Sequence, residues 1–185
     1  MCIRDRIKDI RAGVLDKFFA FLGNGTGKVA DGKDVKTLQA VLAQADAALG
    51  DALEANGDSA ERVVHFVNRF DIADYLAKAD VTMQTMFGMS YLQTFLGVND
   101  IFVTSKVPAG TVYVTPTDNI RIYGVDFGSL SQAGLGYTVQ DGSLVGVHHQ
   151  AAYNRTSSET YALVGADLLP EVTDYIVKAT IAPVA

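Results

Sequence analysis

Residues 95–115, FLGVNDIFVTSKVPAGTVYVT, constrain the fold of this chain most, because they carry two runs of strand-forming residues around a turn. Ile101–Ser105 is rich in β-branched and aromatic residues, and Thr111–Thr115 repeats that character. Between them, the proline and glycine of Val107–Gly110 favour a turn, since proline presets φ and glycine tolerates positive φ. The stretch therefore predicts a β-hairpin with a Pro-Gly corner.

The first part of the chain has helical periodicity. Apolar residues at helical spacing predict helices over Ile7–Leu22 and Leu38–Leu53, and the glycine-rich Gly23–Lys28 (GNGTGK) ends the first of them. On the second helix, acidic residues that lie off the apolar stripe are expected to form a solvated face: Asp46, Asp51 and Glu54. A strand over Arg62–Asn68 then leads into a helix over Phe70–Ala79, and the residues expected to cap that helix are Asn68 and Asp71.

Strands dominate after residue 100. They are expected over Asn119–Val125, Gly136–Gln140, Ser143–His149, Thr160–Leu169 and Asp174–Ile181. Asp141 and Gly142 predict a tight hairpin turn between the second and third of these strands. Helices followed by strands indicate an α+β fold with two lobes, not an all-helical fold or a doubly wound parallel sheet.

Composition narrows the range of possible functions. With 185 residues, 49% of them hydrophobic and 19% charged, the chain can bury a core. The net charge of −6 argues against a surface that neutralises phosphates. No run approaches the ~20 apolar residues of a membrane span. The first six residues, Met1–Arg6 (MCIRDR), read like a translated sequencing adapter and are set aside; they contain Cys2, the only cysteine, so no disulfide is expected.

Motifs for catalysis, metal binding or cofactor binding are weak. GNGTGK follows a helix and lacks the first glycine and the final hydroxyl residue of a phosphate-binding loop, so a loop between domains is the alternative that we favour. His148 and His149 are adjacent on a strand and point to opposite faces, and His65 has no partner at ligand spacing. No serine lies in a nucleophile elbow. Asp71 and Asp74 look like cap and surface residues. We therefore expect no enzyme activity, no metal, no cofactor, and no pocket that pairs a strongly perturbed acid or base with its partner.

The soft apolar cluster Met83, Met86, Phe87 and Met89 predicts core filling, with an adaptable subunit contact as the alternative.

The order of these elements resembles a known family. VVHFVNRFDIADYLAKA precedes the predicted hairpin, and YNRTSSETYALVGADLLP and DYIVKATI follow it. Over roughly Val14–Ile181, this series is similar to the C-terminal two-thirds of a tailed-bacteriophage major capsid protein, with the Hong Kong ninety-seven phage shell fold that encapsulins also use. The resemblance implies that residues 7–28 hold the end of a spine helix and a loop, residues 29–118 an axial domain, and residues 119–185 the return strands of a peripheral domain. The family's N-terminal arm and extended loop have no counterpart.

The resemblance implies a structural role. Copies of the chain would form pentamers and hexamers, assemble with scaffold and portal proteins in the host bacterial cytoplasm, and become the icosahedral virion shell around double-stranded DNA, without binding that DNA specifically or contacting a membrane. Because the arm and loop are missing, we expect the chain alone to be a monomer or an irregular aggregate. One alternative is an encapsulin-type nanocompartment shell. Another is a small soluble α+β enzyme, which would need a polar pocket.

The resemblance also points to one set of contact residues. The family's peripheral domain turns back near the local threefold contacts between capsomers, and the residues at that place are Tyr153, Asn154, Arg155, Ser158 and Glu159. Arginine and glutamate there can pair between subunits, with the bidentate geometry that a guanidinium favours. The alternative is a solvated loop with a weak pair inside one chain.

Overall fold

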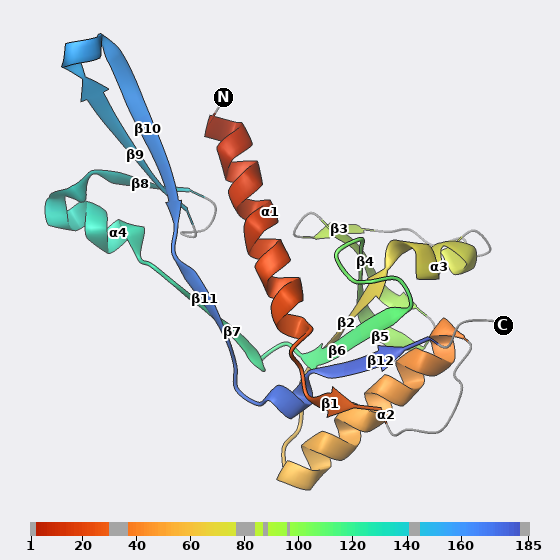
Figure 1. Cartoon of the computed structure of the whole chain (residues 1–185). Helices are drawn as coiled ribbons and strands as arrows, with labels where there is room; N and C mark the ends of the chain where they lie inside the picture. Colours follow the sequence, from red (N-terminus) through yellow and green to blue (C-terminus); the bar gives the residue numbers. More distant parts are fainter. Residues whose placement is uncertain are drawn as a thin grey trace. The chain divides into compact units, whose positions relative to one another are not determined.

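A seven-stranded mixed sheet organises the larger of two units in the computed structural model, which describes residues 3–29, 37–76, 84–86, 89–95, 97–140 and 145–181 (Figure 1). Unit 1 comprises residues 1–18 and 121–169, and unit 2 comprises residues 19–120 and 170–185. Helices and strands are both well represented, so the fold class is α+β, as predicted. None of the described helices combines the length and apolarity that crossing a bilayer requires.

The sheet of unit 2 brings together strands that are distant in the sequence. Its order is β1-β12-β6-β2-β5-β4-β3, and only β1–β12 and β2–β5 pair in parallel among the registers described. The strands span Gly27–Lys28 (β1), Val63–Asn68 (β2), Gln84–Met86 (β3), Met89–Phe95 (β4), Val98–Thr104 (β5), Thr111–Pro116 (β6) and Val177–Thr180 (β12). Strand β12 therefore lies beside β6 in unit 2, whereas the sequence analysis placed it with the peripheral-domain residues 119–185.

The predicted hairpin is wrong in its pairing, although both of its strands exist. β2 lies between β5 and β6, parallel to β5 and antiparallel to β6. The reason is burial: every residue of β2 after Val63 is buried, so the centre of the sheet is the place that covers it. The turn itself behaves as expected, because Gly110 has a φ of 74°. Its N–H donates to Asp71 Oδ2 over 2.7 Å.

Helix α2 (Leu38–Asn56) covers this sheet. It begins at Thr37, whose hydroxyl accepts from the N–H of Ala40, and it ends at Gly57 in the left-handed conformation. Its apolar stripe packs into the core as predicted, with these residues buried: Leu38, Val41, Leu42, Ala45 and Leu49. Helix α3 (Arg69–Leu76) follows β2, and Asn68 Oδ1 accepts from the N–H of Phe70. Asn68 is thus a cap as predicted, whereas Asp71 binds the Gly110 turn.

The GNGTGK segment joins helix α1 (Ile3–Leu22) to the sheet through close backbone contact. A Cβ on Gly25 would lie 2.5 Å from the carbonyl oxygen of Ile176, and a Cβ on Gly27 would lie 2.4 Å from that of Asp174. The glycines are therefore explained by the close approach of the chain before β12. Gly27–Lys28 is itself a strand of the sheet, not a loop.

Unit 1 contains a three-stranded and a two-stranded sheet. In the first, with order β10-β9-β8, β8 (Tyr137–Gln140) and β9 (Val145–Ala152) form the predicted hairpin, and residues 141–144 at its turn lie outside the described residues. The turn η2 (Tyr153–Arg155) links β9 to β10 (Ser157–Val164). The short helices α4 (Phe127–Leu130) and η1 (Ser131–Leu135) precede β8, and η3 (Thr173–Tyr175) precedes β12 in unit 2.

The second sheet corrects one predicted strand. Thr160–Leu169 is not continuous: it breaks at Gly165 into β10 and β11 (Ala166–Pro170), and β11 pairs with β7 (Ile120–Gly124). Gly165 lies so close to the Val125 side chain that an added Cβ would be 2.5 Å from its Cγ2. This contact explains why a glycine stands where the chain passes from one sheet to the other.

Candidate functional site

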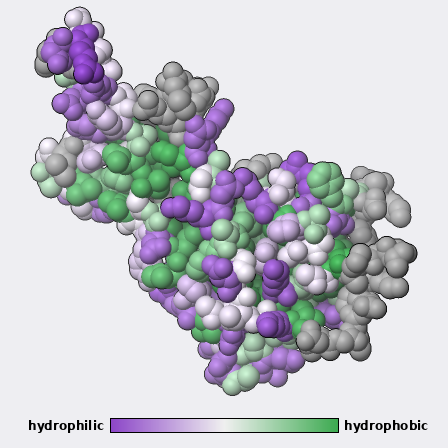
Figure 2. Space-filling view, viewed as in Figure 1, coloured by the Kyte–Doolittle hydropathy of each residue, from purple (hydrophilic) through white to green (hydrophobic). Residues whose placement is uncertain are grey.

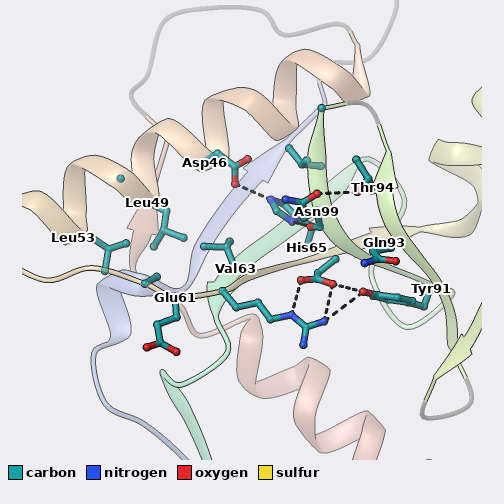
Figure 3. A pocket seen from close by; sticks show the side chains of 16 residues that line it. Asp46, Leu49, Leu53, Glu61, Val63, His65, Tyr91, Gln93, Thr94 and Asn99 are labelled. Carbon is teal, nitrogen blue, oxygen red and sulfur yellow. Dashed lines mark hydrogen bonds and ion pairs between the residues drawn. The ribbon is translucent and has the colours of Figure 1, made fainter.

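Unit 2 holds a polar pocket that the sequence did not reveal (Figure 3). Its volume is about 800 Å³, and it lies between the middle of α2 and the strands β2, β4 and β5. Polar residues of its wall include Asp46, His65, Gln93, Thr94 and Asn99. Thr94 Oγ1 donates to Asn99 Oδ1 over 2.9 Å.

Arg62 and Asp100 form an ion pair in this pocket, and Tyr91 adds a hydrogen bond to it. Arg62 donates from Nε to Asp100 Oδ2 over 2.5 Å and from Nη2 to Oδ1 over 2.7 Å, and the Tyr91 hydroxyl donates to the same carboxylate. Asp100 has a φ of 55°, an uncommon conformation for a residue other than glycine. Its side chain is 10% exposed, whereas that of Arg62 is 52% exposed. The carboxylate is thus buried and held in a bidentate grip at a strained position.

The pKa values of this cluster move away from neutrality. Hydrogen bonding to Asp100 raises the pKa of Arg62 above its ordinary value, and hydrogen bonding to Arg62 lowers the pKa of Asp100. Hydrogen bonding to Asp100 also raises the pKa of Tyr91. Our expectation of no pocket with a strongly perturbed group and its partner was therefore wrong. Because each shift stabilises the form already present at neutral pH, the cluster fixes charge and is not poised for proton transfer.

His65 lies in the same pocket with both ring nitrogens engaged. Nδ1 is 2.8 Å from the carbonyl oxygen of Asn99, and Nε2 is 2.7 Å from Asp46 Oδ1. Our interpretation of Asp46 as part of a merely solvated face is thus wrong, because it contacts a buried side chain. A ring with both nitrogens bound to protein has none to offer a substrate, so Asp46 and His65 do not form a general-base pair.

The other two histidines bind unrelated partners in unit 1. Nδ1 of His148 is 3.1 Å from the carbonyl oxygen of Gly136, and Nδ1 of His149 is 2.9 Å from Thr160 Oγ1. Within the described parts of the chain, no three His, Cys, Asp or Glu side chains are arranged to hold a metal ion. Of the predicted methionine cluster, Met89 is buried, and the side chains at positions 83, 86 and 87 lie outside the described residues.

The predicted contact residues lie together at the tip of the β9–β10 hairpin (Figure 1). Asn154, Arg155 and Ser158 are exposed, and the side chain of Tyr153 lies outside the described residues. Arg155 Nη1 is 3.9 Å from Glu159 Oε1, with both side chains open to water. Such a long, exposed pair inside one chain contributes little to stability. The tip is thus a hydrophilic end, which Figure 2 shows in purple.

Below this tip, unit 1 exposes many apolar side chains (Figure 2). Exposed large hydrophobic residues of unit 1 are Ile122, Tyr123, Val125, Tyr161, Leu163, Val164 and Leu169. Tyr161 ends a row of rings that crosses the three-stranded sheet from Phe127 through Tyr137 and His148, with centroids 5.5–6.5 Å apart. Its hydroxyl donates to Glu159 Oε2 over 2.6 Å, and this hydrogen bond raises the pKa of Tyr161.

A groove of about 320 Å³ runs between α1 and the two-stranded sheet of unit 1. Ile10 and Val14 of α1 line one side, and Ile122 and Leu168 line the other. Sequence reasoning found neither this groove nor the polar pocket, because segments that are distant in the sequence form both. The segments that line the groove are more than a hundred residues apart, and those that line the polar pocket are about forty residues apart. The exposed apolar residues of β10 did carry a signal, since the run TYALV contains no lysine or proline.

The chain was compared with protein-family models, curated proteins and solved structures. No protein-family model matches the chain. No curated protein matches it either. Among solved structures, it is similar to a chain of the satellite phage P4 procapsid that includes the size determination (Sid) protein, with a TM-score of 0.44 and 16% sequence identity. The match covers 85% of this chain and 43% of that chain, so this chain spans less than half the length of its structural neighbour.

Proposed function

We propose that this protein is a structural subunit that self-assembles into the icosahedral head shell of a tailed phage, as a major capsid protein. The observation that carries this proposal is the exposed apolar surface of unit 1. The element order, which resembles that family, supplies the kind of assembly. In this proposal unit 1 corresponds to the peripheral domain and unit 2 to the axial domain.

The two-stranded sheet of unit 1 is the clearest sign of a missing partner. Ile122 and Tyr123 are neighbours on β7, so their side chains point to opposite faces, and they are 56% and 55% exposed. A two-stranded ribbon is marginally stable by itself in water. Apolar side chains exposed on both of its faces favour coverage by another molecule.

Strand β10 offers a second contact. It is a terminal strand of its sheet among the described strands, spans eight residues, and exposes Tyr161, Leu163 and Val164. Long apolar edges are usually protected by charge, proline or a covering segment. A neighbouring copy of the chain would cover this edge and bring two hairpin tips together. There, Arg155 and Glu159 can exchange their weak internal pair for pairs between subunits.

The remaining partners follow from the same proposal. Subunits would meet as pentamers and hexamers, with scaffold and portal proteins taking part in assembly, and the shell would enclose double-stranded DNA. The net charge of −6 suits a wall that surrounds DNA without gripping its phosphates. The proposed role includes no turnover.

Self-association of the chain tests the proposal. We would compare the unmodified chain with Leu163→Glu and Leu169→Glu by sedimentation velocity over a range of concentrations, with circular dichroism to verify folding. Phe70→Glu is the matched control, because Phe70 is 77% exposed but belongs to unit 2. We expect concentration-dependent association that both unit 1 variants reduce and the control retains. Association that both unit 1 variants leave unchanged, or that only Phe70→Glu abolishes, would contradict the proposed surface.

The type of shell requires a second measurement. Electron microscopy of particles made when the gene is expressed in its genomic context should show closed shells. Portal and terminase genes beside it would distinguish a phage head from an encapsulin-type compartment.

A further inference from the structure

The apolar groove of unit 1 is bounded on one side by a single stripe of α1. The residues of this stripe are Ile10, Gly13, Val14 and Lys17. They lie at positions i, i+3, i+4 and i+7, so they share one face of the helix. The opposite wall comes from β7, the end of β10 and β11, and its larger apolar side chains are Ile122, Val164 and Leu168. All of these residues belong to unit 1, so the groove is formed within one compact unit.

Gly13 leaves open space in the wall of the groove. A Cβ added at this position would have nothing within 4 Å among the described atoms. Glycine in the interior of a helix lowers stability relative to alanine, and no close neighbour of Gly13 requires it. The space beside α1 is therefore not the result of a crowded backbone, and it is available to another molecule.

Lys17 supplies the charge of the groove. It is the last residue of the α1 stripe, and it is the only charged one among the described residues that line the groove. Within the described parts of the chain, its side chain has no ion-pair or hydrogen-bond partner. Small-molecule sites are typically apolar, with a few polar groups that fix the orientation of the ligand. An apolar groove with a single cation at one end fits a ligand with an apolar body and an anionic head.

The size of the groove limits the length of this ligand. Its volume of about 320 Å³ lies at the lower end of the ~300–1,000 Å³ of known ligand pockets. A methylene group needs about as much room as a water molecule, ~30 Å³, so the groove holds about ten of them. A helix of a second chain, ~10–12 Å across, would lie on such a groove and not in it.

We propose that the groove binds a monomeric straight-chain carboxylate of about ten carbons, with its chain between α1 and β7 and its carboxylate at Lys17. This ligand site goes beyond the proposed capsid role and does not depend on it. The bound chain would cover Ile122, which is 56% exposed. Tyr123 points to the other face of β7 and would stay available to a neighbouring copy.

Titration of the full chain with decanoate, kept below its micelle concentration, tests the proposal. Calorimetry measures the affinity, and the backbone amide signals of Gly13 and Gly165 in a ¹H–¹⁵N spectrum report the place of binding. We expect saturable one-to-one binding. From hexanoate through octanoate to decanoate, the affinity should rise roughly fourfold for each added methylene and then level off for longer chains. Affinity that keeps rising with length would indicate general adhesion to apolar surface and would overturn the proposal.

Two substitutions separate the chain of the ligand from its head group. Gly13→Leu fills the groove and should abolish binding, whereas Ala12→Leu, exposed on the same helix and outside the groove, should retain it. Lys17→Gln should weaken decanoate binding about three- to fivefold, as expected for an exposed ion pair, but should not change the binding of neutral decanol. Lys8→Gln is the matched control, since Lys8 is exposed on α1 and does not line the groove. Circular dichroism verifies that each variant folds.

The remaining outcomes identify other occupants. Decanoate binding that Gly13→Leu leaves intact would refute the groove as its site. A Lys17→Gln effect of equal size for decanoate and decanol would refute the role of the charge. Self-association that Gly13→Leu abolishes, without saturable binding of decanoate, would show that a second copy covers the groove instead, and binding only to vesicles of anionic phospholipid would show a lipid surface. Each of these results rejects the ligand but leaves the capsid role to be decided by the microscopy of shells.

Discussion

Substituting Gly27 by alanine tests whether the GNGTGK segment is a close-packed joint. The added Cβ would meet backbone, not flexible side chains: it would lie 2.4 Å from the carbonyl oxygen of Asp174 and 2.9 Å from that of Ile176. Carbon and oxygen normally stay ~3.3 Å or more apart. The strand β1 must therefore move by roughly one ångström, and its pairing is only two residues long, Gly27 with Val177 and Lys28 with Lys178.

The expected loss of stability follows from this geometry. Overpacking a tight site costs ~1–3 kcal/mol, and we expect the upper part of that range because the clash is with backbone. Gly50→Ala is the matched control: Gly50 lies inside α2, and nothing is within 4 Å of its added Cβ. Replacing glycine by alanine there should stabilise the helix by ~0.5–1 kcal/mol. The two variants receive the same methyl group, yet they should differ by about 3 kcal/mol in unfolding free energy.

Urea denaturation, followed by circular dichroism, measures both variants. At equal slopes, Gly27→Ala should unfold at lower urea and Gly50→Ala at higher urea than the unmodified chain. If Gly27→Ala were as stable as the unmodified protein, the close approach to Asp174 and Ile176 would not explain the glycine, and the reasoning would fail.

Three further outcomes are expected. Asp100→Asn should lower the free energy of unfolding at neutral pH but match the unmodified chain in acid. Folding lowers the pKa of Asp100, so the stability that its carboxylate contributes is lost as the pH falls through that lowered value; acid-unfolding curves that coincide for the two proteins would contradict this. Gly146→Ala should displace the buried Phe127 ring, whose Cδ1 would be 2.3 Å from the new Cβ, and lower the unfolding midpoint, and an unchanged midpoint would count against the packing. Arg155→Ala should leave the unfolding midpoint unchanged while weakening self-association; a large loss of stability would show that its pair with Glu159 matters within the chain.

Local sequence patterns predicted the positions of helices and strands better than they predicted which strands pair. The stripe Leu38, Val41, Leu42 and Leu49 identified the buried face of α2, because helical spacing is a property of the segment itself. The pairing of β5 with β6 was wrong because a third strand, β2, lies between them. A turn signal shows that the chain reverses but cannot show which distant strand enters the gap.

The candidate sites show the same division. The residues around Arg155 were grouped through the family resemblance, and they lie together on one hairpin tip because they are close in the sequence. The pair Arg62 and Asp100 was missed since the two residues are 38 positions apart and neither has a special sequence context. Asp46 looked like a surface carboxylate on its own helix, and only the position of β2 beneath α2 brings His65 to it. Helix periodicity identifies the face of a residue, not the side chain that meets it.

The two units differ in how completely they bury their apolar residues, and this difference links the fold to the proposed role. The main hydrophobic core, built from α2 and the seven-stranded sheet, lies wholly within unit 2. Of the eight large hydrophobic residues that are exposed among those described, seven belong to unit 1. Since burial of apolar surface is the main force that stabilises folds, unit 2 has a core of its own, whereas the ribbon and edge of unit 1 would gain stability if another molecule covered them. Assembly would then complete the burial that folding of a single chain leaves unfinished, and contact between subunits would stabilise unit 1 most.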